Sequence, residues 1–89
     1  MPKPKTPSES QWNALADLHN HKLAAQGVSR WDFRRRPTQA TLDACLGHGW
    51  VTVRVVAGRG MVYSLTPAGR TAINLVVPGY IPTTDGVQP

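Results

Sequence analysis

Apolar residues recur at helical spacing in the first third of the chain. One side of a helix with about 3.6 residues per turn carries Trp12, Leu15, Ala16, His19 and Leu23, with Leu18 at its margin. Ser8 precedes this run, and Gln11 lies three positions after Ser8. This is the arrangement of a helix capping box. Gly27 suits the left-handed conformation in which helices end. The pattern predicts a first helix over about residues 10–26.

Two shorter helices are predicted after Gly27. The first begins at Ser29 and ends at Arg36, because Pro37 disfavours helical geometry in the residue before it. The second spans about residues 38–48. Its apolar side consists of Leu42, Cys45 and Leu46, and its outer side of Ala40, Asp43, Ala44 and Gly47.

Alternation with a period of two then replaces helical spacing. Valines at 51, 53 and 55 alternate with Thr52 and Arg54, and Met61, Tyr63 and Leu65 alternate with Val62 and Ser64. Gly58 and Gly60 favour a tight turn between these half-buried strands, so the pattern predicts a hairpin.

Thr66 and Pro67 then suit the start of a last helix. We expect it to run to about Val76, with Ala72, Ile73, Val76 and Val77 inward, and the tryptophans at 12, 31 and 50 to pack at the edges of the core.

Two segments carry a resemblance to a known family. They are Leu46–Val51, read as Leu-Gly-His-Gly-Trp-Val, and Tyr63–Arg70, read as Tyr-Ser-Leu-Thr-Pro-Ala-Gly-Arg. Together with the order helix, short helix, helix, hairpin, helix, they resemble the winged helix-turn-helix superfamily, most nearly bacterial regulators of the MarR and PadR types. The resemblance covers roughly residues 27–73. It implies an α+β fold, a small winged helix with a three-helix core, a two-stranded wing and a C-terminal helix.

Composition adds the boundaries and the kind of partner. Proline and small polar residues dominate both ends, so we expect a domain over residues 8–77 between flexible tails at residues 1–7 and 78–89. The 89 residues carry a formal charge of +5, which favours a polyanionic partner. The single Cys45 excludes an internal disulfide and fits a reducing compartment. No apolar run approaches the ~20 residues of a membrane span, so we expect a cytoplasmic protein without a membrane partner.

The resemblance implies that the helix over residues 38–48 enters the major groove of double-stranded DNA. Gln39 and Thr41 would read base edges, and Thr38 would contact a phosphate near the positive end of the helix dipole. Three consecutive arginines precede this helix, and two more lie on the wing. The expected DNA contacts are therefore Arg34, Arg35, Arg36, Thr38, Gln39, Thr41, Arg54 and Arg59. A module of this size is typical of a transcription regulator encoded by a bacterium, a phage or a mobile element.

Other features leave a second function open, that of an adaptor which binds another protein. Asp43 points outward from the proposed recognition helix, where its charge repels phosphates. The strip formed by Ala40, Ala44 and Gly47 suits close packing against a protein helix, and the segment Trp31–Phe33 offers an aromatic contact. A homodimer through the last helix and the tail, at Val76, Val77, Tyr80 and Ile81, is a further alternative.

The sequence offers little for catalysis or metal binding. It contains no carboxylate pair, no nucleophile with an adjacent base and no glycine loop that would cradle a phosphate. Cys45 and His48 are spaced like half of a zinc site, but no second pair accompanies them. We therefore expect a protein that is not an enzyme and that uses no cofactor or metal.

Overall fold

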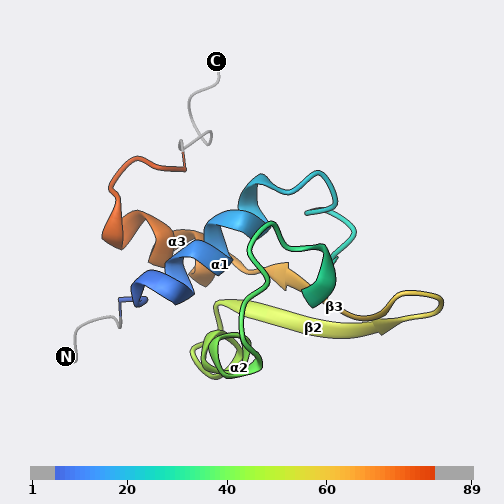
Figure 1. Cartoon of the computed structure of the whole chain (residues 1–89). Coiled ribbons are helices and arrows are strands. Elements are labelled where there is room, and N and C mark those ends of the chain that lie inside the picture. The colour runs from blue at the N-terminus through green and yellow to red at the C-terminus, as the bar shows by residue number, and fades with distance from the viewer. Residues whose placement is uncertain (1–5, 82–89) are drawn as a thin grey trace, which may run out of the picture.

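The computed structural model describes residues 6–81. The elements follow the order α1 (Glu9–Asn20), β1 (Val28–Ser29), the short 3-10 helix η1 (Arg30–Asp32), α2 (Gln39–Gly47), β2 (Val51–Val56), β3 (Gly60–Leu65) and α3 (Pro67–Val76) (Figure 1). The α+β class predicted from the sequence is confirmed. The outer parts of the two expected tails, residues 1–5 and 82–89, lie outside the described residues.

The sheet has three antiparallel strands in the order β1-β3-β2. Tyr63 in the central strand pairs with Val28 on one side and with Val53 on the other. β2 and β3 form the predicted hairpin, whose tip reaches out beyond the helices (Figure 1). The expectation of two strands was wrong, because a strand of two residues is too short to show a period of two in the sequence.

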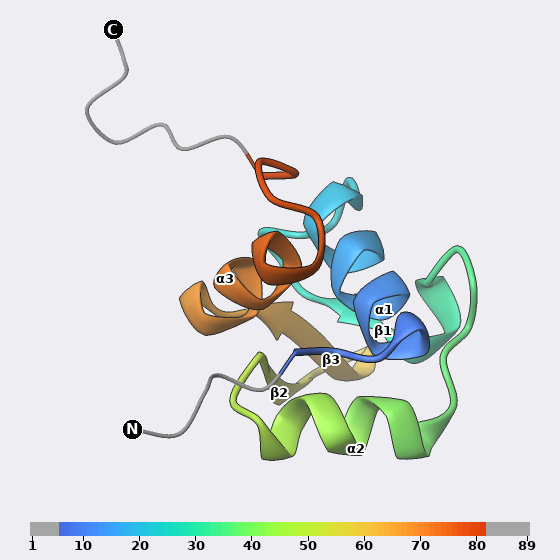
Figure 2. The same ribbon diagram turned by 90° about the vertical axis from the view of Figure 1, so that its left-hand side faces the viewer.

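The core lies between the helices and the hydrophobic side of the sheet. Its largest fully buried side chains are Tyr63, Leu15, Leu18, Leu42, Ile73, Val28, Val62 and Cys45. α1 packs against both α3 and α2, and α2 also packs against β2. In Figure 2, α2 lies by itself along the lower edge of the molecule, with one side turned away from the other elements. Leu18, which the pattern placed at the margin of its helix, is in the centre of the core.

The first helix is shorter than predicted. It ends at Asn20 because His21 adopts an extended conformation, with φ −74° and ψ 140°. The Nδ1 atom of the His21 ring accepts a hydrogen bond from the Leu23 amide at 3.0 Å, which holds the chain in a turn. The predicted start is close to the observed one, since Ser8 and Gln11 form the expected capping box.

The predicted second helix does not form. Ser29 belongs to β1, only Arg30–Asp32 make a turn of 3-10 helix, and the following arginines lie in an irregular connection to α2. Ser29 donates its hydroxyl to the Asp32 carboxylate at 3.0 Å, which closes this short turn. Ser29 precedes the helical turn as predicted, with the extended backbone of a strand residue that pairs with Val62, but the turn ends after Asp32 and does not reach Arg36.

The later helices agree with the sequence prediction. Thr38 caps α2 and Thr66 caps α3, with Pro67 in the first turn of α3. Ala72 and Ile73 are buried as expected, but Val76 and Val77 are 44% and 40% exposed. Their predicted inward position was wrong, because the helix ends at Val76 and the chain turns back over a different side of α3.

Part of the segment assigned to the C-terminal tail is packed against the helices. The ring of Tyr80 meets Trp12 edge to face at a centroid distance of 5.0 Å. Its hydroxyl accepts a hydrogen bond from Asn20 Nδ2 at 2.8 Å. The Ile81 amide donates to Asn74 Oδ1 at 2.9 Å. Residues 80 and 81 therefore extend the core across the ends of α1 and α3.

Candidate nucleic-acid interface

The outer side of α2 is open to solvent, as the sequence predicts. Gln39, Ala40, Asp43 and Gly47 are exposed, whereas the opposite side of the helix is buried. Thr38 fixes the start of the helix, since its Oγ1 accepts a hydrogen bond from the Thr41 amide at 3.1 Å. The helix can thus lie on a large partner without disturbing the core.

A hydrogen-bonded chain crosses this outer side. Gln39 Nε2 donates to Asp43 Oδ1 at 3.0 Å and to the hydroxyl of Tyr63 at 3.4 Å. Because both amide hydrogens are engaged, the group that Gln39 can offer to a partner is its Oε1 acceptor. Asp43 is therefore a positioning partner of Gln39 as well as an exposed negative charge.

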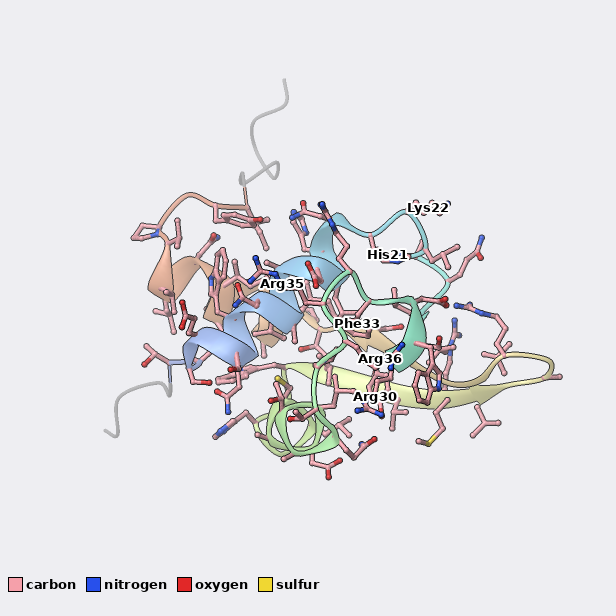
Figure 3. The ribbon with its side chains drawn as sticks, viewed as in Figure 1. His21, Lys22, Arg30, Phe33, Arg35 and Arg36 are labelled. Atoms are coloured by element: carbon pink, nitrogen blue, oxygen red, sulfur yellow. The ribbon has the colours of Figure 1, made fainter. Side chains whose placement is uncertain are left out.

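Three exposed arginines form a rim from α1 to the start of α2. Arg34 and Arg35 line a hollow of about 470 Å³ over α1, beside Asp17. Arg35 and Arg36 line a second hollow, of about 200 Å³, between α1 and Thr38. Figure 3 shows Arg35 beside α1, and Arg36 farther along, next to η1. The Arg35 amide donates to Asp17 Oδ2 at 3.3 Å, which attaches this irregular segment to α1.

The two arginines of the hairpin are bound to the loop beside them. Arg54 Nη2 donates to the carbonyl of Gln26. Arg59 Nη2 donates to the carbonyl of Gly27 at 2.9 Å and lies 3.5 Å from Asp32 Oδ2. Both guanidinium groups therefore hold the hairpin against the segment from Gln26 to Asp32. Contact of either arginine with DNA stays a prediction.

Gly27 permits this close approach. Its φ is +97°, which a residue with a side chain rarely adopts. A Cβ at this position would lie 2.6 Å from Val62 Cγ2. Glycine thus brings the carbonyl that Arg59 needs within reach of the hairpin.

Trp31 is more exposed than a residue at the edge of the core should be. It was expected to pack at the core, but its side chain is 66% exposed. Its neighbour Phe33 is buried, so η1 places one ring inside and the other outside. The alternative of an aromatic contact over Trp31–Phe33 therefore holds for Trp31 alone. Charged residues flank both rings in the sequence, so no local signal distinguishes the exposed Trp31 from the buried Phe33.

The outer part of the hairpin is also more exposed than predicted. Val51 is buried at the base, but Val53 and Val55 are 40% and 77% exposed, and Met61 is 52% exposed. These residues share the side of the sheet that carries Tyr63, as predicted, but burial does not follow the alternation, since Val62 on the opposite side is fully buried. They are exposed because the hairpin extends past the helix that covers its base (Figure 1).

The described residues show no other kind of site. Between residues 6 and 81 no three metal-binding side chains come together, and no helix there has the length and apolar character needed to cross a bilayer. Comparison of the chain with protein-family models, with curated proteins and with solved structures found no match.

Proposed function

We propose that this protein binds double-stranded DNA through α2, as a small cytoplasmic transcription regulator of the winged-helix kind. The observation that carries the proposal is the exposed side of α2 together with the rim of arginines at its start. A helix fits the major groove of DNA, and cations beside it bind the flanking phosphates.

In this proposal the phosphates bind at the start of α2. Arg35 and Arg36 line the hollow next to Thr38, at the end of the helix where the backbone dipole attracts anions. Arg34 continues the positive rim toward α1. These contacts would fix the position of the helix on the duplex without selecting a sequence.

In this proposal Gln39 selects the DNA sequence. With its amide hydrogens held by Asp43 and Tyr63, it presents Oε1, which accepts from the amino groups of adenine or cytosine in the major groove. Thr41 follows Gln39 by two positions, with its hydroxyl 3.0 Å from that of Thr38. The proposed preference is for a base with an exocyclic amino group opposite Gln39.

A protein-binding adaptor is the second candidate. It is favoured by the exposed apolar side chains of Val55 and Met61 on the hairpin and by the exposed Ala40 and Gly47 on α2. An apolar surface of this kind is more typical of a protein contact than of a DNA contact.

Fluorescence polarisation with a labelled random duplex, measured over a series of salt concentrations, tests the proposal. Replacing Arg34, Arg35 and Arg36 together with glutamine should weaken binding on all sequences alike. Gln39→Ala should instead change the preferred sequence. The matched control is the double variant Lys22→Gln and Arg70→Gln, which removes exposed cations away from α2 and should change the affinity little.

The outcomes separate the two candidates. Absence of salt-dependent binding at low ionic strength contradicts the DNA proposal. If Ala40→Glu then abolishes a stable complex with a second protein or a second copy, the adaptor is the function.

A further inference from the structure

Trp31 combines exposure with positive charge. Its indole is 66% exposed in the middle of η1. The guanidinium carbon of Arg36 lies 4.4 Å from the ring centroid, and that of Arg30 lies 5.4 Å from it. Figure 3 shows Arg30 and Arg36 close together beside η1. Met61, 52% exposed, lines the same hollow as Trp31, so the ring belongs to an exposed apolar surface with positive charge beside it, which is the kind of surface that binds a ligand.

The ring forms one wall of a hollow between η1, the start of α2 and the hairpin. This Trp31 hollow has a volume of about 240 Å³ and is lined by Arg30, Trp31, Gln39, Arg59, Met61 and Tyr63, among others. Its walls are aromatic and apolar, its rim is cationic, and no carboxylate lines it. A volume below the ~300 Å³ of drug-sized sites suits one flat ring system.

We propose that the Trp31 hollow binds an unpaired base of a DNA strand. The base would stack on the exposed part of the indole, and the phosphates on either side of it would contact Arg30 and Arg36. This inference rests on the proposed DNA binding, because Gln39 borders both the hollow and the exposed side of α2. The preferred ligand is therefore a duplex that continues into a single strand.

The arrangement favours a nucleotide over a peptide. Arg36 covers part of the ring, and the part that stays exposed lies beside a hollow lined by Arg30 and Arg59, so a ligand stacked there meets positive charge. A nucleotide in a strand combines a stacking surface with a phosphate on each side. Stacking on an aromatic side chain tolerates every base, so this site adds affinity without adding sequence preference.

The test compares three labelled probes: a blunt duplex, the same duplex with a single-stranded thymidine overhang, and oligothymidylate alone. For the wild type the overhang should raise the affinity over the blunt duplex by roughly 5- to 150-fold, the range that one stacked base contributes. Trp31→Ala should remove that gain and leave the blunt-duplex affinity within about twofold. Trp31→Phe, which keeps an aromatic ring, should retain part of the gain.

Tryptophan fluorescence gives a second measurement. Trp50 is buried and Trp12 is half-buried, with its Nε1 donating to the Ile73 carbonyl, so quenching by the overhang should come from Trp31. Trp31→Phe should abolish that quenching. Leu75→Ala is the matched control, since it removes another exposed apolar side chain, on α3, and should change neither measurement.

Each result decides one of the two proposals. Equal affinity for the blunt and overhanging duplexes overturns the Trp31 hollow but leaves duplex binding intact. Binding of the overhang or of oligothymidylate without binding of the blunt duplex supports the hollow and contradicts the major-groove proposal. If no probe binds and Trp31→Ala instead breaks a complex with an acidic peptide or a second copy, the hollow is a protein site and this inference is wrong.

Discussion

Gly69 lies in the first turn of α3 and packs closely against the backbone of Trp50, the residue before β2. Its amide donates to Thr66 Oγ1 at 3.0 Å, which completes the cap of α3. A Cβ on this residue would lie 2.7 Å from Leu65 Cδ1 and closer still to the Trp50 carbonyl oxygen. The glycine of the Thr-Pro-Ala-Gly segment is thus required by close packing, although its φ is an ordinary one.

We predict that Gly69→Ala lowers the free energy of unfolding by about 1–3 kcal/mol, the usual cost of forcing extra atoms into a packed site. Gly47→Ala is the control, because Gly47 ends α2 with open space around it. Alanine should stabilise that helix by up to ~1 kcal/mol. Urea unfolding followed by circular dichroism measures both changes. Equal effects of the two substitutions would contradict the packing argument.

Cys45 is buried in the core on the inner side of α2. Burial raises the pKa of its thiol from 9.0 to about 11, because the thiolate loses hydration inside the protein. At a pH below 9.0 the thiol is neutral in both the folded and the unfolded chain. As the pH rises toward the upper value, only the unfolded chain ionises, so the folded state loses stability.

We therefore predict that the free energy of unfolding falls by about 1.4 kcal/mol per pH unit between pH 9.0 and about 11 from this group. Denaturant unfolding at several pH values measures the slope. Cys45→Ala should show a shallower slope in the same window, since the substitution removes only this thiol. A slope unchanged by the substitution would show that the thiol does not contribute.

At the scale of the elements, helices α1 and α2 pack against the hairpin, and two of its arginines attach it to the loop beside it. Its outer half lies beyond α2, and its contacts with the rest of the chain include the bonds from Arg54 and Arg59 to the carbonyls of Gln26 and Gly27. These bonds explain how an extended two-stranded element stays in place on a small domain.

We predict that Arg59→Ala destabilises the protein by about 1 kcal/mol, the usual net value of such hydrogen bonds. It should also increase amide exchange in β1 and at the tip of the hairpin. Arg34→Ala, which removes an exposed guanidinium from the connection before α2, should stay within about 0.5 kcal/mol of the wild type. Thermal unfolding and hydrogen exchange measure the two effects. Equal destabilisation by both variants would show that Arg59 has no special structural role.

Local signals predicted the elements that are capped within their own sequence. Thr38 and Thr66 each cap the helix that they were assigned to, and the hairpin turn forms around Gly58 as expected. Prediction failed where a distant partner decides the conformation. β1 forms because Val28 pairs with Tyr63, which lies 35 positions away in the printed sequence. A short-range pattern does not contain that information.

The candidate site was predicted in part for the same reason. Residue type and position on a helix were enough to place Gln39 on the exposed side of α2 and Leu42 inside. The partners of Arg54 and Arg59 are carbonyls of a distant loop, which carry no signature in the sequence. The exposure of Trp31 also depends on tertiary structure, because Phe33, two positions later, is the ring that enters the core.

At the scale of the whole molecule, the positive charge is divided between two functions. Arg54 and Arg59 hold the hairpin, whereas Arg34, Arg35 and Arg36 are exposed on the rim beside α2. The formal charge of +5 is therefore not a count of the groups available to a polyanion. If the protein binds DNA as proposed, the salt dependence of the affinity distinguishes the two sets, because each phosphate contact releases counterions.

We predict that replacing one rim arginine with glutamine makes the slope of log affinity against log salt less steep by about 0.9, the value for one phosphate contact on duplex DNA. Arg54→Gln should leave the slope nearly unchanged, because its guanidinium is engaged by the Gln26 carbonyl. Any loss of affinity in that variant would then reflect a displaced hairpin and would be similar at every salt concentration. Polarisation titrations between about 50 and 200 mM salt provide the comparison. Should Arg54→Gln change the slope as much as Arg35→Gln does, the hairpin itself contacts the DNA backbone, and the division between structural and binding arginines is wrong.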